Sequence, residues 1–201
     1  MSDVLLWTLV GFFAGSIPFS LILGKLLVKI DIRTIADGNP GGMNALRAGG
    51  LKTGLPAIIL DISKGFLPVF LAHRYGATGW NLVPVGLAPI LGHAFSPLLR
   101  FRGGKALAAT GGVWMALVGP LVLLIYGLLA LPFTILQSED AWSANAGMLA
   151  LLVYAFLYGE SWLVVFAVLN TVVVIWTHRR DLVRRPQLRP WAADWLTRRS
   201  A

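Results

Sequence analysis

ADGNPGGMNALR, residues 36–47, is a polar, glycine-rich segment between two long apolar segments. Hydrocarbon tolerates irregular backbone only where protein or a water-filled cavity satisfies its polar groups, so we expect this segment to line a site. Glycine and asparagine can take a positive φ angle, and four such residues could direct several backbone N–H groups at one point. They are Gly38, Asn39, Gly41 and Gly42. A phosphate suits that point, and Arg47 could add a bidentate contact to it.

A second segment of the same kind is GHAFSPLLRFRGGK, residues 92–105. Here Arg100, Arg102 and Lys105 surround a flexible Gly103-Gly104 turn, which could bring the lysine ammonium to an anionic substrate. A histidine on an apolar helix is usually a satisfied core group. The neighbouring cations favour instead a functional His93, because imidazole can move protons near neutral pH.

The composition is that of a membrane protein. Of the 201 residues 57% are hydrophobic and 13% are charged, with a mean hydropathy of +0.74. The chain has no cysteine, which excludes a disulfide scaffold, a thiolate nucleophile and Cys-ligated zinc or iron–sulfur sites. The net charge of +8 lies in segments that flank apolar spans, which argues against a nucleic-acid partner.

The apolar segments predict an all-α, polytopic fold of about seven membrane-spanning helices. We expect them near residues 4–28, 55–71 and 82–99, as two helices within 106–136 that turn at Gly119-Pro120, and near 146–158 and 162–176. A kink is expected at residues 15–18, and the third span should bend or unwind near its end. Gly11 and Gly15 are interpreted as a helix-packing pair.

Asp61 and Lys64 lie three residues apart within the second span. Ionisable groups at membrane depth are costly unless they are paired or face a cavity. We interpret the two as an internal salt bridge, with direct participation in chemistry as the alternative.

The cations of the connecting segments predict the orientation. Five Lys or Arg follow the first span, three follow the third and seven lie in the tail, while Arg74 and Lys64 are the remaining two. The positive-inside rule then places the N-terminus outside and the C-terminus in the cytoplasm. One cytoplasmic pocket could collect residues 36–47, 92–105, 137–145 and 178–179. The basic tail, residues 178–201, either lies on an anionic membrane surface or is solvated.

Several stretches, in order along nearly the whole chain, resemble the PlsY family. They are GSIP (15–18), GNPGGMNALR (38–47), LDISKGF (60–66), GHAFSP (92–97), FRGGK (101–105) and HR (178–179). The resemblance implies a bacterial inner-membrane acyltransferase of seven helices, one domain spanning residues 1–201, with its active site on the cytoplasmic face. Such enzymes move a fatty acyl group from acyl phosphate to glycerol 3-phosphate, giving lysophosphatidic acid and phosphate, without a cofactor or metal. A monomer is expected.

The resemblance also implies the site residues. The glycine-rich segment would cradle a phosphate, while Arg47, Lys105, Ser143 and His178 would hold glycerol 3-phosphate. The candidate catalytic residues are His93, Asp37 and Asn39. The candidate binding residues are Gly38, Gly41, Gly42, Asn44, Arg47, Arg102, Gly103, Gly104, Lys105, Ser143 and His178.

The chain departs from the family pattern at several positions of these motifs. Ala36-Asp37 stands where Gly-Ser is usual, Gly42-Met43 where Ala-Thr is usual, Ala106 where glycine is usual and Asp181 where asparagine is expected. Asp37 could pair with Arg33 or Arg47, stay protonated, or act as the base that takes the acceptor's proton. Two other readings of the chain stay open: a divergent paralogue with another acceptor or no activity, and an anion transporter.

Overall fold

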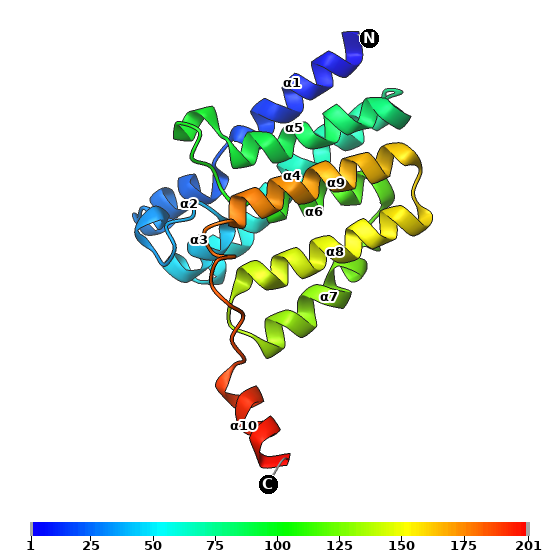
Figure 1. Ribbon diagram of the computed structural model, residues 1–201. Coiled ribbons are helices and arrows are strands. Elements are labelled where there is room, and N and C mark those ends of the chain that lie inside the picture. The colour runs from blue at the N-terminus through cyan, green and yellow to red at the C-terminus, as the bar shows by residue number, and fades with distance from the viewer. Residues whose placement is uncertain (1, 200–201) are drawn as a thin grey trace.

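The computed structural model describes residues 2–199, and every regular element in this range is a helix (Figure 1). The larger elements are α1 (Ser2–Ser16), α2 (Phe19–Val28), α4 (Leu51–Arg74), α5 (Leu82–Ala94), α6 (Leu107–Val118), α7 (Val122–Leu136), α8 (Asp140–Tyr158) and α9 (Ser161–His178). The shorter ones are α3 (Gly42–Gly49), α10 (Pro190–Arg199) and the 3₁₀ turns Ile32–Thr34, Gly79–Asn81 and Pro97–Leu99. The all-α prediction is confirmed.

Five helical segments in the described range are long and apolar enough to cross a membrane. They are Asp3–Val28, Leu51–Arg74, Gly79–Leu99, Asp140–Tyr158 and Ser161–His178. The other two apolar helices, α6 and α7, have 12 and 15 residues. At 1.5 Å per residue they span only about 18 and 22 Å, short of a hydrocarbon core of about 30 Å.

The long helices lie side by side as a bundle, with α2 and α3 at one end and α10 projecting from it (Figure 1). α1 packs on α5, α4 on α6, and α7 on α8. Glycine allows the closest of these approaches. A Cβ added at Gly65 would collide with the Ala109 carbonyl, and one at Gly15 would collide with the backbone of Pro89. The helix-packing interpretation of Gly15 is therefore confirmed.

The predicted interruptions are also present. The first span breaks between Ser16 and Phe19, α5 ends at Ala94 before a 3₁₀ turn, and α6 and α7 meet around Gly119-Pro120. In the core, Trp114 and Phe166 are fully buried, and the Trp114 indole donates a hydrogen bond of 2.9 Å to Asn170 Oδ1. Outward-facing leucines such as Leu124 and Leu128, each 71% exposed, are typical of a lipid-facing surface.

Three boundaries differ from the prediction. Residues 42–49 form α3, because this part of the polar segment packs on α2 and α4. A Cβ at Gly42 would collide with Ile58. α4 is longer than expected, starting at Leu51, and α8 begins at Asp140, where Ala141, Ser143 and Ala144 are buried. Tertiary packing thus extends helices into segments that the hydropathy pattern assigns to loops.

The C-terminal segment is fastened to the bundle before α10 begins. Gln137 and Leu188 form an antiparallel bridge, and Arg189 N donates to Leu136 O at 2.9 Å. The Trp142 indole donates to Arg184 O at 2.8 Å. Part of the predicted basic tail is therefore packed against the segment between α7 and α8. Its last two residues, like Met1, lie outside the described residues.

Candidate functional site

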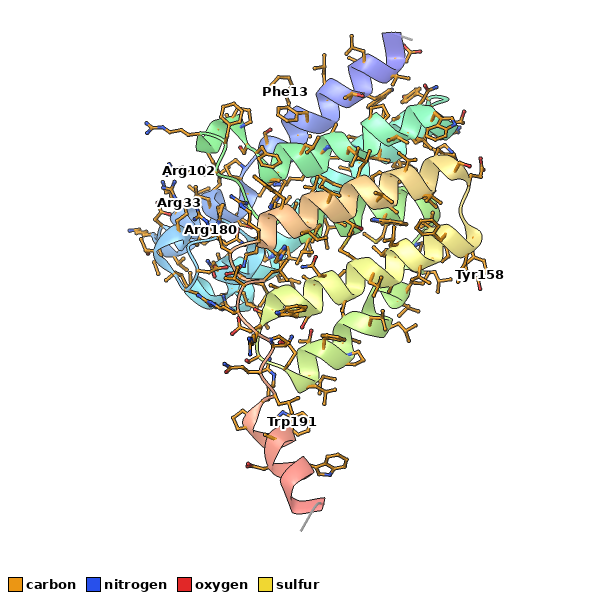
Figure 2. The ribbon with its side chains drawn as sticks, in the orientation of Figure 1. Phe13, Arg33, Arg102, Tyr158, Arg180 and Trp191 are labelled. Atoms are coloured by element: carbon orange, nitrogen blue, oxygen red, sulfur yellow. The ribbon has the colours of Figure 1, made fainter. Side chains whose placement is uncertain are left out.

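A large pocket opens where α5 and α9 end, beside the polar segment before α3. Its volume is about 1200 Å³. Six cationic and two acidic side chains line it. They are Arg33, Arg100, Arg102, Lys105, Arg179 and Arg180, with Asp37 and Asp181. Arg33, Arg102 and Arg180 lie near one another on the same side of the molecule (Figure 2). The pocket therefore favours an anion.

The sequence-predicted residues divide around this pocket. Those that line it are Asp37, Gly38, Asn39, Arg102, Gly103, Gly104 and Lys105. Those that do not are Gly41, Gly42, Asn44, Arg47, His93, Ser143 and His178. The two glycine-rich segments, which 44 residues separate in the sequence, are thus brought together as expected. Several of the individual side chains have other partners.

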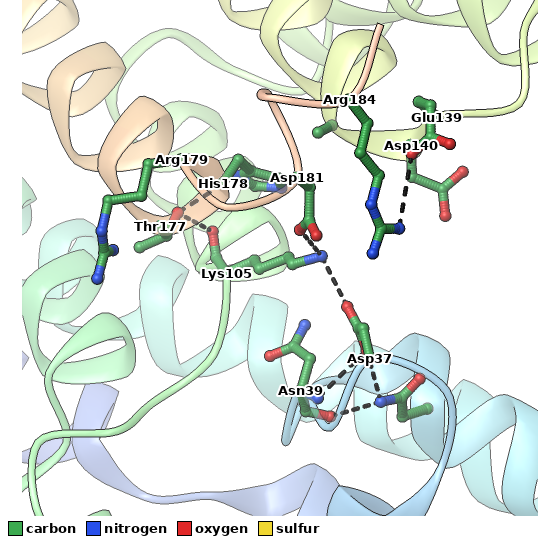
Figure 3. Close-up of polar contacts among 12 residues, drawn as sticks. Asp37, Asn39, Lys105, Glu139, Asp140, Thr177, His178, Arg179, Asp181 and Arg184 are labelled. Carbon is green, nitrogen blue, oxygen red and sulfur yellow. Dashed lines mark hydrogen bonds and ion pairs between the residues drawn. The ribbon is translucent and has the colours of Figure 1, made fainter. Parts of the chain in front are cut away.

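Lys105 lies between two carboxylates (Figure 3). Its Nζ is 2.7 Å from Asp37 Oδ2 and 2.8 Å from Asp181 Oδ2. The Thr177 hydroxyl donates to the Lys105 carbonyl oxygen at 3.2 Å, which ties the Gly103-Gly104 turn to the end of α9. We call Asp37, Lys105 and Asp181 the acid–lysine clamp. It joins three segments: the loop before α3, the turn after α5 and the segment after α9.

The clamp shifts the pKa of two of its members. Burial alone would raise the pKa of Asp37, but the hydrogen bonds from Lys105, Asn44 and the Asn39 amide outweigh it, so the pKa is lowered. Burial alone would lower the pKa of Lys105, but its hydrogen bonds to Asp181 and Asp37 outweigh it and raise the pKa. Both groups are therefore charged at neutral pH.

The expected partners of Asp37 prove to be wrong. Arg33 is engaged by Asp31, with Nη2–Oδ2 and Nε–Oδ1 distances of 2.6 and 2.9 Å. Arg47 donates to Asn44 Oδ1 at 3.0 Å and lies 3.7 Å from Asp140. Asp37 is ion-paired, which was one of the alternatives. Its partner is Lys105, from the other glycine-rich segment.

The Asn44 side chain stabilises the conformation of the polar segment through hydrogen bonds to three of its residues. Its Nδ2 lies 2.9 Å from Asp37 Oδ1, 2.9 Å from Asn39 O and 3.0 Å from Ile35 O. The Asn39 amide also donates to Asp37 Oδ1 at 3.2 Å. The segment's hydrogen bonds are therefore partly internal, and Asn44 orders the pocket wall from a buried position.

Positive φ angles occur at fewer of the predicted glycine and asparagine positions than expected. Only Gly38 among those four has one, +73°. Two alanines adopt the left-handed conformation instead, Ala36 at +46° and Ala106 at +63°. An L-residue pays about 1–2 kcal/mol for this conformation. The loops therefore keep a backbone shape suited to glycine at two positions where the chain has alanine.

His93 lies behind the pocket, against the Gly103-Gly104 turn. The Gly104 amide donates to the His93 carbonyl at 3.0 Å. A Cβ added at Gly104 would collide with His93 Nε2 and lie 3.3 Å from Asn39 Oδ1. Glycine at this position therefore lets an imidazole nitrogen and an amide oxygen approach the same point.

A buried ion pair lies on the other side of His93. Lys64 Nζ is 2.7 Å from Asp61 Oδ1, so the predicted salt bridge is confirmed. Ser20 Oγ donates to Asp61 Oδ2 at 2.7 Å, and Lys64 donates to Ile17 O at 2.7 Å. His93 Nδ1 is 3.9 Å from Asp61 Oδ1, across from a cavity of about 10 Å³ that His93 and Lys64 help to line. A cavity of this size is near the lower limit for one water molecule.

Ser143 and His178 are buried, and neither lines the pocket. Ser143 Oγ accepts a hydrogen bond of 2.8 Å from Gln137 Nε2. His178 Nδ1 is 2.8 Å from the Val174 carbonyl oxygen. Arg179 lines the pocket, as expected for residues 178–179, and so do Arg33, Thr177 and Arg180, which the sequence analysis did not select for the site. The signal for the arginines was their proximity in sequence to the selected residues.

Within residues 2–199, no group of three or more His, Asp or Glu side chains is placed to hold a metal ion. The pocket offers guanidinium groups, an ammonium, a glycine turn and an imidazole behind it. These groups can orient a phosphate-bearing molecule and stabilise negative charge that develops in a reaction.

Comparisons with known proteins agree with this chemistry. A family model described as glycerol-3-phosphate acyltransferase matches residues 5–187. The glycerol-3-phosphate acyltransferase of Maridesulfovibrio salexigens is 34% identical over 178 residues, covering 89% of this chain and 91% of that protein. Glycerol-3-phosphate acyltransferase 1 of Thermotoga maritima is 37% identical over 190 residues, covering 86% and 93%.

Two crystal structures resemble the fold closely. They are of PlsY, an integral membrane glycerol 3-phosphate acyltransferase, in its glycerol 3-phosphate form and its lysophosphatidic acid form. Each matches with a TM-score of 0.80 and 30% identity, over 90% of this chain and 90% of the other.

Proposed function

Because the chain belongs to the glycerol-3-phosphate acyltransferase family, we propose that it acylates glycerol 3-phosphate in phospholipid biosynthesis, with acyl phosphate as the donor. The products are lysophosphatidic acid and inorganic phosphate. The observation that carries the proposal is the cationic pocket, where the two glycine-rich segments meet at one end of an apolar bundle. Such a site can hold a phosphate-bearing acceptor while an acyl chain stays in the membrane.

The reaction needs little covalent chemistry from the protein. The acceptor's hydroxyl oxygen attacks the acyl carbonyl carbon, the bond from that carbon to the phosphate oxygen breaks, and phosphate leaves. The hydroxyl proton passes to a base. The pocket's cations would position both phosphates and neutralise the leaving group. We assign the proton transfer to His93, whose Nε2, like the Asn39 side chain, lies beside Gly104.

Asp37 is the alternative base, but the clamp argues against it. A carboxylate whose pKa is lowered holds a proton less well, and Lys105 occupies one of its oxygens at 2.7 Å. We therefore place Asp37 in the substrate-binding part of the site, together with Gly38, Arg102, Gly103 and Lys105. Asn44 and Arg47 support the loop, and Ser143 and His178 are buried side chains that do not line the pocket.

The test uses purified protein, acyl phosphate and labelled glycerol 3-phosphate, with lysophosphatidic acid as the readout. Arg102→Ala should lower acceptor use by about ten- to a hundredfold, the range for a lost charge-assisted contact. Arg74→Ala, at the far end of α4, removes a cation outside the pocket and should not change the kinetics. If the parent forms no lysophosphatidic acid from acyl phosphate, the proposed reaction is wrong.

We further propose a single monomeric domain over residues 1–201 in the bacterial inner membrane, with seven spans and the pocket at the cytoplasmic face. The termini lie at opposite ends of the molecule (Figure 1). Whether α6 and α7 each cross the bilayer or return as a short hairpin, they add an even number of crossings. The termini are then on opposite sides in both cases.

Cysteines test this orientation cleanly, because the chain has none of its own. Introduced one at a time at Ser2 and Ser200, they should react with an impermeant thiol reagent in intact cells only at position 2. Labelling at position 200 alone would reverse the orientation.

A further inference from the structure

The last helix of the described chain follows the residues that the family model matches. That match covers residues 5–187, and α10 begins at Pro190. Between them, Arg189 is bonded to the end of α7. Its backbone amide donates to Leu136 O at 2.9 Å, and its Nε donates to Thr134 O at 3.1 Å. α10 therefore starts from a point that is fixed to an apolar helix of the bundle.

The end of α7 belongs to the lipid-facing surface. Leu131, Ile135 and Leu136 are exposed there, and exposed leucine and isoleucine on a membrane bundle are typical of contact with hydrocarbon. The segment before α10 continues this apolar surface, since Leu188, which forms a bridge with Gln137, is 50% exposed. We therefore place the start of α10 near the boundary between hydrocarbon and water.

α10 has an apolar face of its own. Trp191 and Trp195 are four residues apart, so they lie on the same side of the helix, and they are 53% and 50% exposed. Figure 2 shows Trp191 on the part of the chain that projects from the bundle. Tryptophan is enriched where lipid meets water, because its ring is apolar and its N–H is polar. This face therefore suits the headgroup region of a bilayer.

The charge of this part of the chain is strongly positive. Residues 178–201 contain seven arginines and two aspartates. Of these arginines, Arg184 and Arg185 are exposed and lie outside the pocket, and Arg198 and Arg199 are the last two residues of α10. A basic residue near a surface of anionic lipid strengthens binding by about fivefold. Positive charge beside an interfacial aromatic face indicates a partner that is both apolar and anionic.

We propose that α10 is an interfacial helix that binds the anionic lipid surface of the membrane in which the bundle lies. Trp191 and Trp195 enter the headgroup region, and the arginines that precede and end the helix contact the anionic headgroups. In Figure 1 α10 runs across the direction of α8 and α9, as a helix along the membrane surface does when those two helices cross the bilayer. The occupant is lipid and not a protein, because the exposed face of α10 continues the lipid-facing surface of α7. The inference does not depend on the reaction at the pocket.

The test places one spin label at a time on α10 of the full chain, which has no cysteine of its own. Trp195→Cys labels the apolar face and leaves Trp191 in place, while Ala193→Cys labels the opposite side of the helix. The nanodiscs contain either phosphatidylcholine alone or equal amounts of phosphatidylcholine and phosphatidylglycerol. Spin relaxation by oxygen, which concentrates in lipid, is compared with relaxation by a water-soluble nickel chelate.

With phosphatidylglycerol present, the label at position 195 should be relaxed more by oxygen, and the label at position 193 more by nickel. Two-component spectra then give the ratio of docked to undocked α10. That ratio should fall about tenfold or more in phosphatidylcholine alone, because the anionic headgroups are missing. It should fall in the same way in about 1 M salt, which screens charges at the surface.

Removing the four arginines named above should have the same effect. The quadruple variant Arg184→Gln/Arg185→Gln/Arg198→Gln/Arg199→Gln should lower the docked-to-undocked ratio in phosphatidylglycerol nanodiscs by about tenfold or more. The matched control removes the same number of exposed cations elsewhere and should leave the ratio unchanged. It is Lys25→Gln/Lys29→Gln/Lys52→Gln/Arg74→Gln.

Two results would overturn the proposal. Equal access of nickel to positions 195 and 193 in phosphatidylglycerol nanodiscs would mean that α10 is solvated or binds a different partner. Docking that is equally strong in phosphatidylcholine and without the four arginines would mean that headgroup charge does not recruit the helix. A chain that docks α10 but forms no lysophosphatidic acid would refute the proposed reaction and support this inference.

Discussion

The chain contains two carboxylate–lysine contacts of the same length in different surroundings. Asp61 and Lys64 meet at 2.7 Å inside the bundle, with side chains 2% and 3% exposed. Asp37 and Lys105 also meet at 2.7 Å, but at the pocket, with side chains 34% and 23% exposed. The inner pair has little access to water or to other ions, whereas the outer pair can exchange partners. Distance alone therefore does not distinguish a structural pair from one that a substrate can reach.

The inner pair should give the largest effect when it is broken. Lys64→Met leaves Asp61 as an uncompensated buried charge, which typically costs about 3–5 kcal/mol. The free energy of unfolding in mixed micelles measures the loss. The double variant Asp61→Asn/Lys64→Met removes both charges and should recover much of the stability. If Lys64→Met alone costs less than the corresponding change at Lys105, the contrast between the two pairs is incorrect.

His93 connects the two regions, since Nδ1 faces Asp61 and Nε2 faces Gly104. His93→Ala should lower kcat by about a hundredfold with little change in KM for glycerol 3-phosphate, because general acid–base catalysis contributes at least this much. Ser96→Ala is the control. Ser96 lines the same small cavity and donates to Ser16 O at 2.6 Å, so its loss should affect stability and not turnover. A change confined to KM would argue against proton transfer by His93.

Glycine has a different role in each region, and Ala106 allows a test of the difference. In the bundle, glycines such as Gly65 provide space, while beside Lys105 an alanine has a φ of +63°. Ala106→Gly should therefore stabilise the protein by up to about 1 kcal/mol, after the greater freedom of glycine in the unfolded chain is counted. Ala116→Gly, within α6, should instead destabilise by about 1 kcal/mol. Thermal unfolding would show shifts of opposite sign.

The smallest effect should be the pH dependence of the clamp. The pKa of Asp37 is lowered on folding, so its contribution is present above the unfolded value near 3.8 and is lost as pH falls through the folded value. The pKa of Lys105 is raised, so its contribution is present below 10.5 and lost at higher pH. The stability gap between the parent and Asp37→Asn should stay below about 1 kcal/mol, because the pair is partly exposed. It should narrow as the pH falls below the unfolded value of 3.8 and towards the lower folded pKa, and a gap that widens there would contradict the assignment.

The sequence predicts the fold well because hydropathy and helix-breaking residues act locally. Pro18 and Gly119-Pro120 lie at the two breaks where the sequence places them. Proline alone does not end a helix in this chain, since Pro56, Pro68, Pro89 and Pro132 lie inside helices. The start of α8 at Asp140 was missed, because it depends on Ala141 and Ser143 being buried against other helices. No local pattern reports that contact.

The sequence predicts which two segments form the site, but it does not predict which side chains contact each other there. Glycines and cations identified residues 36–47 and 92–105. The partner of Asp37 was missed because Lys105 is 68 residues away and the nearer Arg33 already pairs with Asp31. Asp181 was noted as a departure from the family pattern, but its contact with the same lysine requires the end of α9 to lie beside the turn after α5.

The attachment of the C-terminal segment has a practical consequence for shortening or labelling the chain. Its backbone bonds to the bundle run from Gln187 to Arg189, just before α10. A stop codon placed after residue 189 would remove α10 and spare these bonds, whereas one placed before residue 184 would also remove the backbone acceptor of Trp142. A purification tag or fluorescent fusion is therefore best joined beyond α10. There it would disturb α10 and not the segment that borders the pocket.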